Sequence, residues 1–317
     1  MIRFIVVRLL QAVPILLGIS LLAFMLLKAI PGGPTAAYYG NASVTGADLQ
    51  RIESEMGLDE PLIVQYLTWL GKFLGGDWGI SYVSRTPVLE LLGQRLPATL
   101  ELMGAAVLLS VVVAVPLGTL AAVRRNTKVD YALTFASFAG LSIPVFWLGL
   151  MVIVLFTVQL GWFPGGGIGP ATGEVGVLTR LQYLVLPTLT LSFVSVGFFT
   201  RYLRASMLEI MHSDFMRFAR ARGIPPTRLY LRHGLRNASI PFVTVVALHI
   251  PEYLVGAVVV ETIFSWPGTG RLFWESATRF DYPVLMGVLV LGSALVIVCN
   301  LAADVIYSLI DPRIRHV

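Results

Sequence analysis

The sequence predicts an all-α integral membrane protein with six transmembrane helices. Of its 317 residues, 56% are hydrophobic and only 13% are charged, and the mean hydropathy is +0.79. Long uncharged runs recur along the whole chain, and each approaches the roughly 20 residues that a helix needs to cross the bilayer. Because these runs are continuously apolar rather than alternating, they favour helices over a β-barrel.

Six stretches are long and apolar enough to span a membrane. They are 9–30, 99–123, 131–160, 181–204, 238–264 and 283–309. The first follows Arg3 and Arg8, as a secretory signal would, but its uncharged run from Leu9 to Leu27 exceeds the 7 to 15 residues of a signal core. Prolines lie within or at the ends of the spans, where a packed bundle tolerates kinks; they are at 14, 116, 144, 187, 241, 251 and 283.

The basic residues lie in the gaps between the apolar runs. The N-terminal tail, the 124–130 loop, the 201–236 segment and the C-terminal tail are rich in Lys and Arg and would share one side of the membrane. The other side carries fewer basic residues, mixed with acidic ones. The positive-inside rule therefore predicts that both termini are cytoplasmic, and topology explains the net charge of +5 better than nucleic-acid binding does.

The chain divides into four predicted parts. These are a cytoplasmic tail with the first span (1–30), an extracytoplasmic loop (31–98), a core of five spans (99–310) that contains a long connecting loop (205–240), and a cytoplasmic tail (311–317). Within the 31–98 loop, apolar residues recur at helical spacing before the Gly75-Gly76 pair, at Ile63, Tyr66, Leu67, Leu70 and Leu74. This pattern predicts a short amphipathic helix.

The connecting loop has the signals of a second short helix. Residues 212–214 (HSD) supply an N-terminal cap, and Gly223 with the prolines at 225 and 226 ends the helix. One face is expected to hold Phe215, Phe218, Ala219 and Arg222, and another helix should run from the prolines through Leu229, Leu231 and Leu235 towards Pro241. These residues alone leave two interpretations open: the short helix fills a groove on another protein, or its arginines bind anionic lipid.

Ionisable residues inside spans are candidates for a translocation path because burying them in lipid is costly. His249 and Glu252 share one helical face at a spacing of three, and a hydrogen-bonded helix contact is the alternative. Glu101, Glu261 and Asp304 are expected near the membrane interface, solvated or paired with an arginine. The scattered histidines and single cysteine predict no metal site or disulfide, and no catalytic motif is recognised. Without a phosphate loop, the chain is not expected to hydrolyse ATP.

Several motifs resemble one transporter family. Residues 214–223 (DFMRFARARG) and 231–241 (LRHGLRNASIP) are similar to the cytoplasmic coupling loop of permeases in the dipeptide and oligopeptide ABC importer family. Further stretches resemble its B-type subunit: GLDEPL at 57–62, GDWG at 76–79, RLPATL at 95–100, LSIPVFWLG at 141–149, LGWFP at 160–164 and ETIFSWPGTGR at 261–271. The wider superfamily has Glu-Ala-Ala where this chain has Arg217-Phe218-Ala219, and only Ala219 and Gly223 fit that wider pattern, which favours the peptide-type subgroup.

This resemblance implies a type I ABC importer permease fold in the inner membrane of a bacterial or archaeal cell. It implies a homologous second permease, two cytoplasmic ABC ATPases and an extracytoplasmic substrate-binding protein as partners, besides the lipid bilayer. ATP and Mg²⁺ would bind to the ATPases, and this chain would bind no cofactor and no nucleic acid. The residues expected to contact an ATPase are Asp214, Phe215, Arg217, Phe218, Ala219, Arg220, Ala221, Arg222 and Gly223.

The implied substrates are short peptides. Glutathione, nickel chelates or oligosaccharides are the alternatives within the same architecture. A stand-alone secondary transporter is the alternative mechanism, and a membrane enzyme is the alternative outside transport.

Overall fold

A computed structural model describes residues 2–29, 51, 54, 57–170 and 176–310. Within them the chain is helical, with one isolated bridge between Ile80 and Pro87 and no strand, which confirms the all-α class. The predicted tail 311–317 and residues 31–50 of the predicted loop lie outside the described residues. The chain forms two compact units, one of residues 1–98 with 268–297 and one of 99–267 with 298–317.

Five of the predicted spans are single helices that are long and apolar enough to cross a membrane. They are α1 (Ile2–Lys28), α4 (Val88–Val123), α7 (Val177–Met211), the continuous helix Pro226–Ile263 and α12 (Tyr282–Ile310). Several are longer than predicted, because amphipathic turns extend the apolar runs. The continuous helix, for example, runs through α9 (Pro226–Arg228), η3 (Leu229–Leu235) and α10 (Arg236–Ile263).

The predicted span 131–160 is broken at Pro144 rather than mildly kinked there. It consists of α5 (Lys128–Ser142), then α6 (Val145–Ile153) with a π-helical end η2 (Val154–Gln159), and the two halves are bent by 101°. Ile143 between them is extended, with φ −86° and ψ 123°. A residue before proline is sterically disfavoured in the α region, so Pro144 accounts for the break. The chain has six spans if this bent pair crosses the membrane once.

The first unit contains α1, α3 (Leu62–Leu74), α11 (Thr269–Thr278) and the start of α12. The amphipathic helix predicted after residue 62 is confirmed as α3. Its Tyr66 is buried against Phe24 of α1 and Met286 of α12, and the Tyr66 hydroxyl lies 2.9 Å from Ser20 Oγ. A single aromatic side chain thus ties α3 to two candidate spans.

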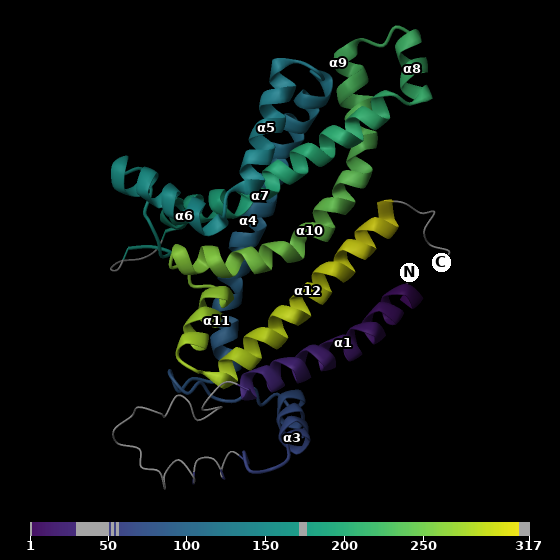
Figure 1. Cartoon of the computed structure of the whole chain (residues 1–317). Helices are drawn as coiled ribbons and strands as arrows, with labels where there is room; N and C mark the ends of the chain where they lie inside the picture. The colour runs from purple at the N-terminus through teal and green to yellow at the C-terminus, as the bar shows by residue number, and fades with distance from the viewer. Residues whose placement is uncertain (1, 30–50, 52–53, 55–56, 171–175, 311–317) are drawn as a thin grey trace. The chain divides into compact units, whose positions relative to one another are not determined.

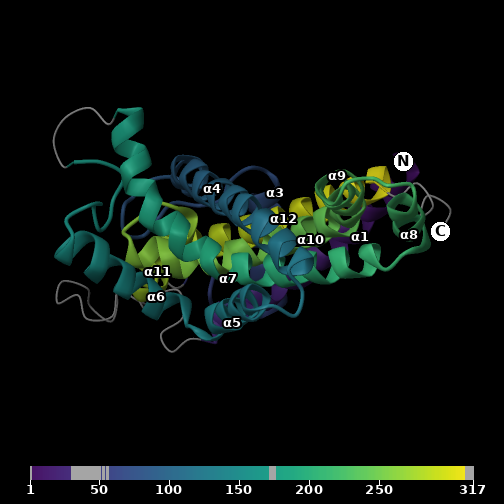
Figure 2. The same ribbon diagram turned by 90° about the horizontal axis from the view of Figure 1, so that it is seen from above.

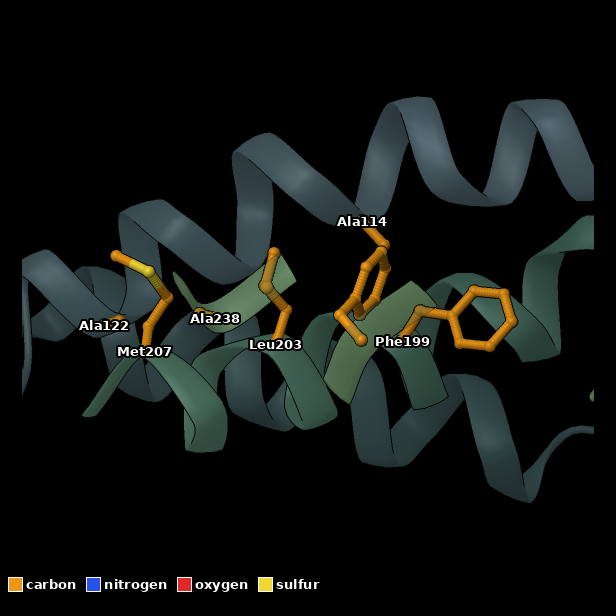
Figure 3. Packing of buried hydrophobic residues seen from close by; sticks show 7 residues of the cluster. Ala114, Ala122, Phe199, Leu203, Met207 and Ala238 are labelled. Carbon is orange, nitrogen blue, oxygen red and sulfur yellow. The ribbon is translucent and has the colours of Figure 1, made fainter. Parts of the chain in front are cut away.

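The second unit is built around α7, which packs against α5, α6 and α10. Figure 3 shows Phe199, Leu203 and Met207 of α7 on successive turns beside small alanines of the neighbouring helices. The buried cluster consists of these residues with Ala114, Ala122, Ala238 and Phe242. Large side chains from one helix fill the space that the alanines leave, as in close-packed protein interiors.

Two glycines let helices of the second unit approach closely. A Cβ atom at Gly118 of α4 would lie 2.8 Å from the Thr200 carbonyl oxygen, and one at Gly197 of α7 would lie 2.8 Å from the Ser137 carbonyl oxygen. Both distances are too short for a side chain. Membrane helices gain much of their association from such backbone approach, because lipid provides no hydrophobic driving force between them.

Candidate functional site

The short helix predicted in the connecting loop is α8 (Asp214–Ala221). Both views place it beyond the end of α7 and beside α9 (Figures 1 and 2). Gly223 has φ +77°, a left-handed conformation that glycine adopts without strain, so the predicted stop is confirmed. The expected side-chain cap is wrong: Ser213 occupies the cap position, but its hydroxyl donates to the Ile210 carbonyl oxygen at 2.6 Å.

The inner face of α8 is anchored to the rest of the unit. Met216 is fully buried and Ala219 nearly so, and both pack against Leu229 of η3. Ala219 was predicted to share a face with the phenylalanines, and this is wrong, because it lies one turn from Met216 and packs inward with it. Gly234 of η3 lies beside this anchor, since a Cβ there would be in ordinary contact with Met216 Cε, at 3.7 Å.

The outer face of α8 carries aromatic rings and cations. Phe218 is 65% exposed and Phe215 is 42% exposed. The guanidinium carbon of Arg222 lies 5.8 Å from the centre of the Phe218 ring, and Arg217 forms an ion pair with Asp214. The other predicted contact residues, Arg220, Ala221 and Gly223, are exposed as well. Aromatic residues and arginine are the residue types enriched in protein interfaces.

The second predicted helix of this loop is present but does not end near Pro241. It begins at Pro226 and continues through η3 into α10 as far as Ile263. Displacement of η3 would therefore be passed directly to a candidate membrane span. A π-helical segment inside an α-helix frequently marks a functional site.

An ion pair with a buried carboxylate joins the first turn of α5 to α7. Arg204 donates to both carboxylate oxygens of Asp130, at 2.6 and 2.8 Å, and the Asn126 backbone N–H donates to the same carboxylate at 3.0 Å. Close by, Arg125 Nη1 lies 3.4 Å from His212 Nε2. Both segments were predicted on one side of the membrane, but the Asp130–Arg204 pair was not predicted, because nothing in the local sequence signals a partner 74 residues away.

The predicted pair on α10 is formed. His249 Nδ1 lies 3.0 Å from Glu252 Oε2, and the side chain of Glu252 is 69% exposed. The imidazole stacks on Phe198 with ring centres 4.9 Å apart. Phe199 and Tyr253 also lie against the imidazole, and Tyr253 donates a hydrogen bond to Ser110 Oγ at 2.8 Å. The helix contact named as the alternative is therefore present, and a role in a translocation path stays a prediction.

Three further carboxylates, Glu101, Glu261 and Asp304, were expected to be solvated or paired with an arginine, and for Asp304 this stays a prediction. Glu101 accepts hydrogen bonds from Arg180 Nε and Nη2, which confirms the pairing. Glu261 is fully buried and accepts a hydrogen bond from Thr99 Oγ1 at 2.7 Å, so solvation there is wrong. The local sequence shows only that Glu261 lies near the end of a span. Its burial is decided by how the helices pack.

Comparisons with known proteins agree on one family. The family model described as "binding-protein-dependent transport system inner membrane component" matches residues 114–316, and the model of its N-terminal region matches residues 1–103. The chain is 44% identical to an oligopeptide transport system permease protein of Bacillus subtilis, with all of both chains covered. It is 36% identical to a dipeptide transport system permease protein of Escherichia coli, covering 100% of this chain and 99% of that protein.

A solved structure has the same fold. A chain of the methionine ABC transporter MetNI in inward-facing conformations aligns with a TM-score of 0.57, covering 70% of this chain and 97% of that one, at 20% sequence identity. At this identity the likeness supports the fold alone. The two family matches and the full-length relatives go further. This chain belongs to the family of binding-protein-dependent transport system inner membrane components.

Proposed function

We propose that this permease forms half of the pathway through which an ATP-driven importer carries short peptides. A homologous permease would form the other half, and an extracytoplasmic binding protein would deliver the peptide. Two cytoplasmic ATPases would hold ATP and Mg²⁺ and supply the energy. The names of the full-length relatives, oligopeptide and dipeptide permeases, support the substrate class.

The docking site for an ATPase is proposed to be α8 with its flanks, residues 213–223. One observation carries this proposal: Phe215 and Phe218 of α8 are exposed, whereas Met216 is fully buried and packs against Leu229. Exposed aromatic rings on a rigid support can fill a groove on a partner and transmit its displacement. The continuous helix from Pro226 would carry that displacement into the membrane.

This assignment requires α8 to face the cytoplasm, as the positive-inside rule predicts. The contact between Arg125 and His212 supports it, because it joins two basic segments that the rule assigns to one side. The peptide path is proposed to run past Glu252 and His249. Glu252 exposes a carboxylate that could meet the ammonium group of a peptide.

The docking proposal is tested by removing the two exposed rings together, as Phe215→Ala with Phe218→Ala, in the complete transporter. We expect co-purification of the ATPase and ATP-driven peptide uptake to fall at least about tenfold, since interface aromatic residues commonly contribute 2 kcal/mol or more. The chain should remain inserted in the membrane.

The matched control is Phe135→Ala, which removes a ring that is 75% exposed on α5. It should leave ATPase association and uptake unchanged. Normal ATPase association in the double variant would exclude α8 as the docking site. Competition of uptake by unlabelled dipeptides, oligopeptides, glutathione and oligosaccharides would establish the substrate class separately.

A further inference from the structure

A cavity in the first unit is separate from α8 and from the His249–Glu252 pair. Its volume is about 640 Å³, and its lining comes from α1, the 57–60 turn, α3, the 77–82 segment and the start of α12. This volume falls within the range of roughly 300 to 1,000 Å³ that small-molecule sites occupy. Hydrogen bonds next to the cavity hold two of its lining segments together. The Asp281 carboxylate, beside Tyr282, accepts one from Ser81 Oγ at 2.5 Å and one from the Tyr82 N–H at 3.1 Å.

The cavity lies where two candidate spans end. Lys28 is the last residue of the α1 span and Tyr282 is the first residue of the α12 span, and both line the cavity. The ends of membrane-spanning helices lie at the membrane interface, where Lys, Trp and Tyr side chains are favoured. The neighbouring α3 exposes apolar side chains, at Leu62, Ile63, Leu67 and Leu74, as interfacial helices do.

The lining combines both signs of charge with aromatic walls. Lys28 and Lys72 supply two cations, and Glu60 and Asp77 supply two carboxylates. Lys28 Nζ donates to the Gln65 amide oxygen and lies 5.6 Å from the centre of the Phe24 ring. The walls include Trp69 and Trp78, which sandwich Phe73 with ring centres 5.2 and 4.2 Å away.

Tyr282 lines the cavity and carries a polar group that no described residue satisfies. Its side chain is only 6% exposed, and its hydroxyl has no hydrogen-bond partner among the described residues. A buried polar group without a partner costs free energy, so native structures seldom leave one. The Tyr282 hydroxyl is therefore a donor that no described protein acceptor uses.

We propose that this cavity binds the headgroup of a zwitterionic, amine-bearing phospholipid. The two lysines and the Tyr282 hydroxyl would hold the phosphate. Asp77, Glu60 and the tryptophan faces would hold the ammonium group, which aromatic rings attract through their quadrupole. The acyl chains would lie in the adjoining bilayer, because Lys28 and Tyr282, which line the cavity, are end residues of two candidate spans. A free dipeptide has the same two charges but no acyl chains to hold it at the membrane interface, which favours the lipid.

The test is native mass spectrometry of the complete detergent-solubilised transporter, titrated separately with phosphatidylethanolamine, phosphatidylglycerol, glycerophosphoethanolamine and Ala-Ala dipeptide. We expect saturable binding of phosphatidylethanolamine, with at least about tenfold weaker binding of the other three probes. Lys28→Met with Lys72→Met should weaken phosphatidylethanolamine binding at least about tenfold, since each charge-assisted hydrogen bond is a strong one.

Two further variants keep the result interpretable. Tyr282→Phe removes only the hydroxyl oxygen, preserves the shape of the ring, and should weaken binding a few-fold. Lys128→Met, which changes the remaining lysine of the chain, lies outside the lining and should leave binding unchanged. Three results would each overturn the proposal: no saturable binding of phosphatidylethanolamine, equal weakening by Lys128→Met, or tighter binding of the dipeptide or of phosphatidylglycerol.

Discussion

Replacing Asp130 by alanine should destabilise the second unit strongly. The Asp130 side chain is 2% exposed and accepts two hydrogen bonds from Arg204, at 2.6 and 2.8 Å, and one from the Asn126 N–H at 3.0 Å. The substitution leaves the Arg204 guanidinium without its counter-charge. Breaking a buried ion pair by removing one partner typically costs about 3–5 kcal/mol. We expect a loss near the lower end, about 3 kcal/mol, because the Arg204 side chain keeps 27% exposure.

The assay is reversible unfolding by sodium dodecyl sulfate in mixed micelles, which measures the free energy of unfolding. Four proteins are compared: wild type, Asp130→Ala, Arg204→Met and the double variant. Because the double variant leaves no buried charge unpaired, it should be less damaged than the sum of the single losses by about 2 kcal/mol. Asp214→Ala, at a 90% exposed carboxylate, is the control and should change stability by no more than about 0.5 kcal/mol.

Two results would refute this reasoning. A loss below about 1 kcal/mol for Asp130→Ala would mean that water replaces the carboxylate at no cost, contrary to its burial. Additive losses in the double variant would mean that the two side chains do not act as a unit.

Three further predictions concern the packing and the proposed path. Gly197→Ala should lower the free energy of unfolding by about 1–3 kcal/mol, because the added Cβ would lie 2.8 Å from the Ser137 carbonyl oxygen. In the same unfolding assay, the control Gly104→Ala should be neutral or slightly stabilising, because a Cβ at Gly104 meets nothing within 4 Å. Met216→Ala should destabilise the docking of α8 on its unit, because deleting a fully buried Met side chain costs about 2–5 kcal/mol. Faster amide hydrogen exchange confined to residues 213–223 would support this, and unchanged exchange would contradict it. Glu252→Gln should lower the rate of peptide uptake several-fold while ATPase association persists, and uptake at the wild-type rate would remove Glu252 from the proposed path.

Some features of the fold could be predicted from local sequence. The apolar runs predicted the number of spans, counting the bent pair once, and the periodic residues after Leu62 predicted α3. The prolines and Gly223 predicted the limits of α8 to within a residue or two. The bend before Pro144 had a local cause as well, although the sequence analysis treated it as a tolerable kink.

The inward face of α8 was predicted wrongly. Ala219 follows Met216 by three positions and Phe215 by four, so helical periodicity alone groups it with either residue. Only the packing against Leu229 in the folded unit shows that Met216 and Ala219 face inward. The exposed rings of Phe215 and Phe218 are a consequence of that choice.

By itself, the sequence determined the helical membrane class, the approximate spans and the coupling-loop motif, because hydropathy, helix caps and helix stops depend on residues within a few turns of one another. The tertiary structure alone decided which charges are paired, as in Asp130 with Arg204, and which residues line the cavity between α1, α3 and the start of α12. Those features join segments far apart in the chain. Their energies depend on burial and distance, which arise only when the helices pack.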